Sequence, residues 1–359
     1  MQLRLTLFLL CALPTTIVMA DEALSQAWRT MVNSGPDTIP VILKQLETAN
    51  PTQANWLRTA VDAIVDNELA AGRKPDQASL ESYLKDTSHA PRNRRMVYEW
   101  IIKIDPAAKA IWIPTFMNDP SLELRRDAIA DALEKLPKDA DRKAGLRKIL
   151  AYTRDRDQVD AIAKELKTLG DEVDLAGHFG FIREWAVLST FDNTSEKGFA
   201  AVYPPEQKLD WKTLYTGKDN KPTAWKLVTS KDNYGKIDLA KNIGKFKASV
   251  AYAAAIVKVD QPTRIDLRAN TLNSIKVWLN GKEVIAHEEY HHGDNLDQYV
   301  GQGMLNAGEN LILVKICQND QKESWAQAWE FALRLCDNLG TAVKVDLVPA
   351  PVHNATPAK

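Results

Sequence analysis

The alternation of apolar and polar residues along the chain is clearest over residues 273–285, NSIKVWLNGKEVI. Ile275, Val277 and Leu279 occupy every second position, and an Asn-Gly pair follows at 280–281. Both residues of that pair tolerate positive φ, so the pattern predicts a β-hairpin closed by a type I′ turn. Further extended runs, separated by Gly, Pro and Asn, predict strands at 184–188, 226–228, 249–259, 263–268, 275–279, 282–286, 310–317 and 330–336. Many short strands without helical spacing indicate an antiparallel β-sandwich or barrel.

Upstream of residue 170 the apolar residues recur at intervals of three and four, which is the spacing of amphipathic helices. The stripes are Leu57, Ala60, Val61, Ile64, Val65 and Leu69; Met96, Val97, Trp100, Ile101 and Ile104; Leu122, Ala128, Ile129, Ala132, Leu133 and Leu136; and Val159, Ile162, Ala163, Leu166 and Leu169. Asn-Pro or Asp-Pro pairs at 50–51, 105–106 and 119–120 are expected to end one helix and begin the next. The sequence therefore predicts a helical domain over 21–170, a linker at 171–182 and a β domain over 183–348.

Two helical segments, 39–60 and 113–128, look like imperfect copies of each other. Each has an Ile-Pro pair that opens a short helix, an Asn-Pro or Asp-Pro turn, and a second helix that carries Arg and Ala. This arrangement resembles HEAT-like repeats, in which helix pairs stack into a curved solenoid. The resemblance implies that the arginine bonds a turn aspartate and that the solenoid offers a surface to another macromolecule.

Large and charged residues of the helical half have structural interpretations. Trp56, Trp100 and Trp112 are expected to be core residues, because large aromatic side chains are usually buried. The basic cluster at 92–95 has two interpretations: a binding site for an anionic partner, or the solvent-exposed start of a helix whose arginines pair with Glu99. The second interpretation is favoured. No helical segment assembles a catalytic set.

The first 20 residues have the pattern of a secretory signal peptide. Arg4 precedes an apolar run over 5–18, and Val18-Met19-Ala20 provides small residues for cleavage before Asp21. We therefore expect an exported protein, periplasmic or extracellular, with no membrane insertion after cleavage. The net formal charge is −1, so nothing in the composition indicates an electrostatic nucleic-acid binder, although a local basic patch stays open. Residues 349–359 are expected to form a disordered tail.

Two cysteines remain after removal of the signal segment, Cys317 and Cys336. Alternation places Cys317 on the strand face of Lys315 and Cys336 on that of Arg334. If these two strands pair antiparallel, the cysteines lie roughly 20 Å apart, beyond the ~7 Å Cα separation that a disulfide tolerates. The sequence therefore predicts two unpaired thiols.

The β half also resembles a known family. The segments at 275–282 (IKVWLNGK), 305–315 (LNAGENLILVK) and 331–335 (FALRL) are similar to galactose-binding-like jelly-roll modules, the sugar-binding domains of glycoside hydrolases. Upstream, the segments at 178–181, 191–193 and 204–206 and Trp185, taken with the helical half, resemble exported HEAT-repeat proteins of the type found in Planctomycetes. The resemblance implies a HEAT-like α-solenoid followed by a jelly-roll β-sandwich that binds carbohydrate or protein.

The chain departs from that family at two places. Ser189-Thr190 stands where these proteins tend to carry Gly-Pro, and Leu272-Asn273 replaces an acidic pair before the hairpin. The second departure weakens any inherited metal or sugar site near that turn.

The segment His287-Glu-Glu-Tyr-His291 fits the H-E-x-x-H pattern of zinc metalloproteases. That chemistry needs a helix, since only there do both histidines share one face and leave the Glu as general base. Here the segment continues a strand and runs into Gly293, so we expect a strand end and a polar loop. A metal site made by His287, His291, His292 and Asp294 is the alternative, and it would support a hydrolase or other metal-dependent enzyme.

Binding by aromatic side chains is the remaining class of function, because sugars stack on aromatic rings that have polar groups around them. Alternation places Trp278 on the outward face of its strand, and Trp325 lies in the loop before the last strand. Trp329 is expected in the core. We take Trp278, Trp325, Tyr290 and Asp294 as candidate ligand-binding residues, with no catalytic residues and no cofactor. The sequence thus favours a non-catalytic scaffold that binds a glycan or an envelope or secreted protein.

Overall fold

The computed structural model describes residues 17–352, so most of the predicted signal segment at 1–20 and the end of the predicted tail lie outside the described residues. The chain divides into two compact units, Met1–Gln158 and Val159–Lys359. The division falls earlier than the expected boundary at 170, so most of helix α10 (Arg156–Thr168) belongs to the second unit. Within the described part of the chain, no helix is both long and apolar enough to cross a membrane.

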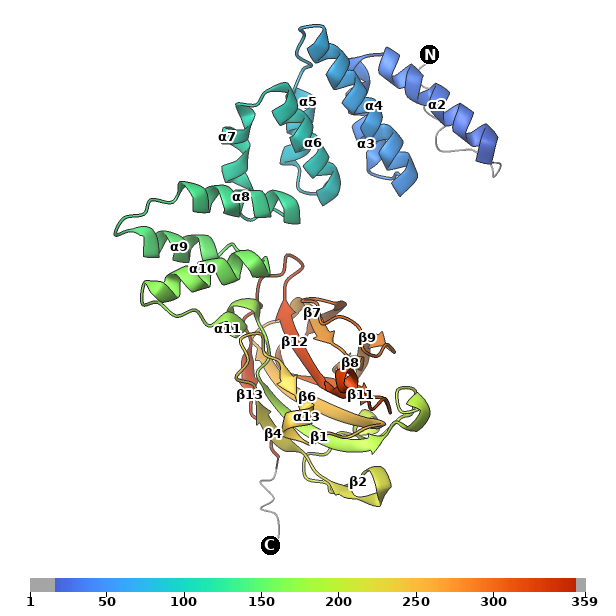
Figure 1. The fold of residues 1–359 in the computed structure, drawn as a ribbon, viewed down its shortest axis with the longest axis vertical. Coiled ribbons are helices and arrows are strands. Elements are labelled where there is room, and N and C mark those ends of the chain that lie inside the picture. The colour runs from blue at the N-terminus through green and yellow to red at the C-terminus, as the bar shows by residue number, and fades with distance from the viewer. Residues whose placement is uncertain (1–16, 353–359) are drawn as a thin grey trace. The chain divides into compact units, whose positions relative to one another are not determined.

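The first unit is built from helices that follow one another in chain order (Figure 1). They are α2 (Ile17–Asn33), η2 (Pro36–Thr38), α3 (Ile39–Leu46), α4 (Pro51–Ala70), α5 (Ala78–Lys85), α6 (Pro91–Ile104), α7 (Ala108–Trp112), η3 (Ile113–Phe116), α8 (Leu122–Lys135) and α9 (Arg142–Leu150). Asn50 caps α4, since its Oδ1 accepts from Gln53 N at 2.9 Å while Gln53 Oε1 accepts from Asn50 N at 3.1 Å. The Asn-Pro and Asp-Pro pairs thus lie between helices as predicted.

One hydrophobic core joins these helices from Ala27 to Ala128. The predicted stripes of α4 and α6 face it, and Trp100 and Trp112 are buried in it. The buried stripe predicted for α8 is wrong at its first residue. Leu122 is 53% exposed, and Leu124 is buried instead. Leu122 is the first residue of α8, after the Ser121 cap, and the buried face of that helix runs through Leu124, Ala128 and Ile129.

A buried ion pair lies inside the first unit. Arg94 is only 2% exposed, and its guanidinium contacts both carboxylate oxygens of Asp119 at 2.6 and 2.8 Å. Arg125 Nη1 donates to the Asp119 carbonyl at 2.7 Å. Arg95 pairs with Glu99 at 2.9 Å, as the solvated interpretation of the 92–95 cluster predicts, but that interpretation is wrong for Arg94. Arg94 is buried because α6 turns this side chain toward the loop that precedes α8.

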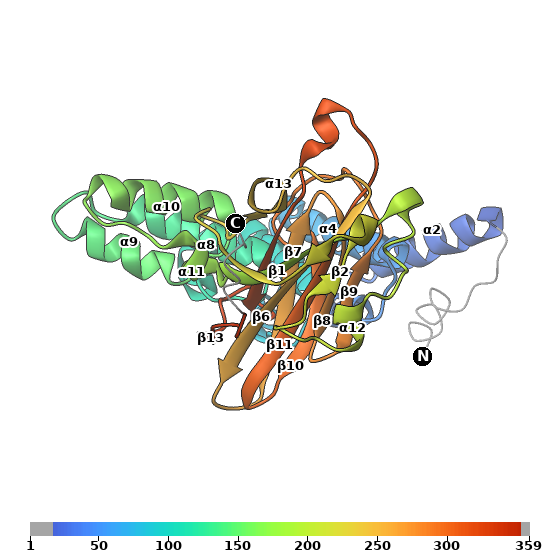
Figure 2. The same ribbon diagram turned by 90° about the horizontal axis from the view of Figure 1, so that it is seen from below.

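The second unit contains antiparallel sheets (Figure 2). Among the described residues, a seven-stranded sheet has the order β4-β1-β6-β11-β8-β9, with β13 also paired to β6, and a four-stranded sheet has the order β10-β7-β12-β5. The strands are β1 (Glu184–Asp192), β2 (Tyr215–Thr216), β3 (Pro222–Thr223), β4 (Lys226–Thr229), β5 (Ile237–Asp238), β6 (Ser249–Val259), β7 (Thr263–Thr271), β8 (Ser274–Leu279), β9 (Lys282–His287), β10 (Tyr299–Leu305), β11 (Gly308–Gln318), β12 (Glu330–Cys336) and β13 (Asp346–Val348). Helices α11 (Leu175–Phe179), α12 (Pro204–Gln207) and α13 (Leu239–Asn242) and the short turns η4 (Thr194–Glu196), η5 (Lys218–Asn220) and η6 (Ser324–Gln327) complete it.

Both large sheets contribute to one core, and the seven-stranded sheet has a second apolar cluster on its other face. Strand β11 shows why. Ile312, Val314 and Ile316 enter the shared core, while Leu313 and Cys317 face the outer cluster under the 199–225 segment. A strand buried on both faces reads as a nearly continuous apolar run, as β11 does.

The predicted strands and the hairpin at 274–287 are present, with Asn280 and Gly281 at φ of 51° and 82°. Strand β10 was not predicted, because Gly301 and Gly303 interrupt its alternation. A Cβ at Gly301 would lie 2.4 Å from Val284 O, and one at Gly303 would lie 2.5 Å from a Leu279 methyl. These glycines let β10 approach the hairpin closely.

The ends of the β domain also differ from expectation. Helix α11 lies inside the expected linker, and Ile182 N donates to Leu333 O at 3.0 Å, so residues 175–182 belong to the folded β unit. At the other end, Ala350 and Val352 pack against the outer cluster, so the described part of the predicted tail is ordered.

Cys317 and Cys336 are unpaired, as predicted, and both are buried. The antiparallel pairing of their strands, on which that prediction was based, does not occur. Strand β11 pairs with β6 and β8, whereas β12 pairs with β7 and β5. The two thiols therefore lie in different sheets. Burial raises the pKa of Cys317 to about 12 and that of Cys336 to about 11.

We expect both thiols to be inert in the native protein. The thiolate is the reactive species, and with these pKa values almost none forms at about pH 8. Titration with an aromatic disulfide reagent should show negligible reaction in buffer and release of both thiols in denaturant. Rapid labelling of native protein would contradict the burial of these side chains.

Replacement of Arg94 by Ala should destabilise the first unit by about 3–5 kcal/mol, since it leaves the Asp119 carboxylate buried without its partner. Arg126→Ala is the matched control, because the Arg126–Asp157 pair is largely exposed and its loss should cost about 1 kcal/mol or less. Urea unfolding followed by far-ultraviolet circular dichroism checks both values. Equal losses in the two variants would contradict the role of the buried pair.

Candidate functional site

Four loops meet at one end of the β unit, at residues 193–198, 244–248, 288–298 and 319–328. Backbone hydrogen bonds join them: Asn193 N donates to Ala248 O at 2.8 Å, and Ala248 N donates to Asn319 O at 2.7 Å. The third loop is attached through His291 N, which donates to Leu272 O at 2.6 Å. Figure 2 shows the 319–328 loop, which contains η6, projecting from the sheets. We call this group of loops the loop end.

The buried side chain of Asn193 links its own loop to the 288–298 loop and to the end of β11. Its Nδ2 donates to Tyr290 Oη and to Gln318 O, both at 3.0 Å, and its Oδ1 accepts from Gly198 N at 2.9 Å. Burial raises the pKa of Tyr290 to about 12, so its hydroxyl stays protonated at neutral pH. Tyr290 therefore has a structural hydrogen bond at the base of the loop end.

Trp325 is the more exposed of two large aromatic residues that the loop end exposes, with 61% of its surface accessible against 41% for Phe246. It lies in η6, and its ring meets the His291 ring edge-on, with centroids 5.0 Å apart and planes at 88°. His291 Nε2 lies 3.0 Å from Asn319 Oδ1. The indole therefore contacts the His291 imidazole, and most of its surface is exposed.

The loop that carries Trp325 is held by side chains that bond its backbone. Gln318 Nε2 donates to Ala326 O at 3.2 Å and to Ala328 O at 3.0 Å, and Lys247 Nζ donates to Ala326 O at 2.6 Å. Gln327 Nε2 donates to the carbonyls of residues 322 and 323 at 2.9 and 2.8 Å. The exposed ring is thus presented by a preorganised loop.

The structure does not bring the predicted metal residues together. His287 is exposed and stacks on Tyr299 with centroids 4.1 Å apart, His291 contacts Asn319, and His292 is exposed. Asp294 instead pairs with Lys236 at 2.6 Å. Over the part of the chain that the structure describes, no three His, Cys, Asp or Glu residues are grouped to hold a metal ion. The H-E-x-x-H segment is a strand end and loop, as predicted.

Trp278 does not join the loop end. It is half-buried, and it packs against the outer cluster of the seven-stranded sheet. The prediction that its face is open is wrong, because the 199–225 segment covers that face. Trp329 is buried in the core as expected.

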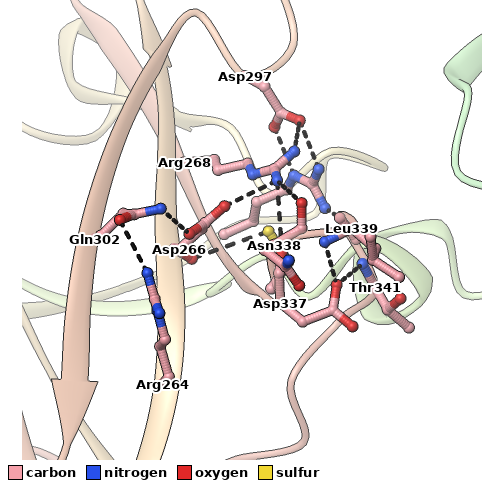
Figure 3. Close-up of polar contacts among 12 residues, drawn as sticks. Arg264, Asp266, Arg268, Asp297, Gln302, Asp337, Asn338, Leu339 and Thr341 are labelled. Atoms are coloured by element: carbon pink, nitrogen blue, oxygen red, sulfur yellow. Dashed lines mark hydrogen bonds and ion pairs between the residues drawn. The ribbon is translucent and has the colours of Figure 1, made fainter. Parts of the chain in front are cut away.

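Two aspartates anchor the 288–298 loop to the sheets. Asp294 accepts from Lys236, which also contacts Glu330 at 2.7 Å. Asp297 accepts from Arg334 Nε at 2.6 Å and from Arg268 Nη1 at 2.9 Å (Figure 3). Burial alone would raise the pKa of Asp297, but the hydrogen bonds and charges of Arg334 and Arg268 outweigh it and lower that pKa. The sequence analysis did not single out Arg268 and Arg334 as functional residues. The signal that could have identified them is that each is a charged residue at an outward position of an otherwise apolar strand.

Comparison with known proteins yields no family model and no curated protein that matches the chain. Two crystal structures of β-glucosidase from Kluyveromyces marxianus match with TM-scores of 0.30 and 0.29 at 11% identity. They cover 68% and 74% of this chain, which spans about a third of that protein (34% and 36%). A GH31 α-xylosidase from Xanthomonas citri matches with a TM-score of 0.17 at 9% identity, over 32% of this chain and 14% of that one. At these TM-scores the likeness does not establish a common fold.

The Asp297→Asn variant should lose stability at neutral pH, by about 3 kcal/mol, because it removes a charge that neutralises buried arginines. The native pKa of Asp297 is lowered, so its contribution is fully present above the unfolded value near 4 and is lost as pH falls through the native pKa. Urea midpoints of wild type and variant should therefore converge below about pH 3.

Asp219→Asn, which changes an exposed carboxylate, is the control and should not alter the midpoint. A difference between wild type and Asp297→Asn that persisted undiminished in acid would exclude the ionised carboxylate as its cause.

Proposed function

We propose that this chain is an exported, non-catalytic binding protein. Its β unit, a galactose-binding-like jelly roll, binds a glycan at the loop end, and its helical unit, a HEAT-like solenoid, binds a protein partner. Export follows from the signal pattern at 1–20. The two activities lie in separate units, as in a scaffold that attaches a protein to a polysaccharide.

The observation that carries the glycan proposal is the exposed, preorganised indole of Trp325. A tryptophan side chain with 61% exposure leaves apolar area in water without a folding benefit. Several side chains nevertheless fix its loop, so binding there costs little loop-ordering entropy. A rigid exposed aromatic ring is a typical anchor for a ligand.

The surroundings of Trp325 favour a sugar over an apolar ligand. The His291 imidazole contacts the ring, and it is linked to the Asn319 amide, whose Nδ2 donates to Gln321 Oε1 at 2.9 Å. Sugars present an apolar ring face together with hydroxyl groups, and this combination matches an aromatic platform edged by donors and acceptors.

The helical unit supports a protein-binding role through its surface. Successive helices pack on one another, α2 and α3 on α4 and α5 on α6, as a repeat arrangement requires. Exposed apolar side chains remain on it, including Ile111 at 70%. In our proposal these side chains add apolar contact area to the interface with the protein partner.

Trp325→Ala in the full chain should weaken binding to the recognised polysaccharide by roughly tenfold or more, the equivalent of about 1.4 kcal/mol. Affinity electrophoresis against a panel of neutral polysaccharides measures this, and the Phe variant at the same position should bind at an intermediate level. Leu214→Ala removes another exposed apolar side chain, at 68% exposure, and is the matched control.

Retention that is lost in Trp325→Ala but kept in Leu214→Ala would support the proposal. Retention of both variants equally, or no retention of the wild-type chain on any neutral glycan, would refute glycan binding at the loop end.

A further inference from the structure

The outer face of the four-stranded sheet carries an unusual set of polar side chains (Figure 3). Registers pair Arg264 with Met304, Asp266 with Gln302 and Arg268 with Val300 across β7 and β10, and Arg334 lies opposite Arg268 on β12. The intervening residues of β7, Ile265, Leu267 and Ala269, are in the shared core. Alternation therefore places this set together on the face away from the core. We call it the arginine face.

Most charges of this face are already paired. Asp297 accepts from both Arg268 and Arg334, and Asp266 accepts from Arg268 Nη2 at 2.9 Å. Asp337 Oδ1 accepts instead from the backbone of its own turn, at Leu339 N and Thr341 N. The hydrogen bonds of these three carboxylates are therefore made to groups of the chain itself.

Arg264 is the exception. Its side chain is exposed, and its hydrogen-bond partner is the neutral Gln302, with Nη2 to Oε1 at 3.3 Å. Among the described residues it makes no ion pair. Nearby, Arg268 Nε is buried and has no hydrogen-bond acceptor in the described part of the chain. The face thus has spare donors and one guanidinium charge that no carboxylate of the described chain neutralises.

Apolar side chains flank these donors along β10. Val300 and Met304 are each 51% exposed, and Gln302 lies between them. The exposed side chains of Val300, Gln302 and Met304 thus form a row beside the Arg264 guanidinium. This combination suits a ligand that has both apolar patches and a carboxylate. Guanidinium forks bind carboxylates through two parallel hydrogen bonds.

We propose that the arginine face binds an acidic polysaccharide, with the carboxylate of a uronic acid unit on Arg264 and neighbouring ring faces on Val300 and Met304. This site is separate from Trp325 and does not depend on the loop-end proposal. An acidic peptide would gain most by adding a strand to the edge of β10. Such a peptide would lie in the plane of the sheet, whereas a ligand that contacts Arg264 on β7 together with Val300 and Met304 on β10 must lie across the face of the sheet. A sugar chain needs no such backbone pairing.

The test compares polygalacturonate with its methyl-esterified form, which has the same backbone without the charge. Affinity electrophoresis of the full chain should show binding to the acid form only, weakened by added salt. Arg264→Gln should reduce that binding roughly tenfold, which is the effect of about 1.4 kcal/mol. Because Arg264 is exposed, the variant is expected to keep the wild-type unfolding midpoint.

Two control variants distinguish binding at Arg264 from general attraction between the chain and a polyanion. Lys282→Gln removes an exposed charge on β9 and should leave binding unchanged, as should Trp325→Ala. Loss of binding in Lys282→Gln equal to that in Arg264→Gln would indicate non-specific attraction and overturn the proposal. Equal binding of the esterified polymer, no binding of the acid form, or tighter binding of polyglutamate would also overturn it. The outcome for Trp325→Ala on neutral glycans remains a separate result.

Discussion

The β unit depends on one constraint, the burial of strand β11 on both faces of its sheet. Its even-numbered apolar residues fill the core shared with the four-stranded sheet, and its odd-numbered residues require a second cover, which the 199–225 segment provides. Lys315 lies under that cover, where it is fully buried and contacts Glu206 Oε1 at 2.9 Å and two backbone carbonyls, those of Phe199 at 3.1 Å and Ala201 at 2.6 Å. A buried ammonium needs such partners, since its desolvation costs several kcal/mol. These contacts attach the first part of the covering segment to β11.

Ion pairs inside apolar surroundings recur in this protein. Arg94 with Asp119 in the helical unit, Lys315 with Glu206 and Arg334 with Asp297 in the β unit each connect segments that are distant in sequence. Such pairs contribute little net stability compared with apolar replacements, but the loss of one partner is costly. Their effect is to favour one packing arrangement of loops over others.

The two proposed ligand surfaces differ in how they are built. The loop end presents the Trp325 ring on a loop whose backbone is held by side chains, so in our proposal its specificity comes from stacking and from the neighbouring His291 imidazole. The arginine face belongs to regular strands, where alternation sets the spacing of donors and apolar groups. A glycan that contacts both would meet a neutral stacking site and a charged site on one module.

The sequence by itself determined the local elements of this protein. Three- and four-residue spacing identified the helices, period-two alternation identified the long strands, and Asn280-Gly281 located the hairpin, because these signals depend on residues close in the chain. The same local reasoning correctly placed the H-E-x-x-H segment in a loop and Trp329 in the core. It missed β10, because the glycines of this strand break the alternation, and they are needed where β10 lies close to the β8–β9 hairpin.

Tertiary structure alone decided which elements meet. It placed Cys317 and Cys336 in different sheets, buried Arg94, covered Trp278 and separated His287, His291 and Asp294 onto different partners. Of the four candidate ligand-binding residues, it left Trp325 exposed and brought it to His291. Each of these outcomes depends on strand order and on side chains tens of residues apart, which propensity and spacing do not encode. The sequence therefore determines the elements and the faces they present, and the pairing of those faces determines the sites.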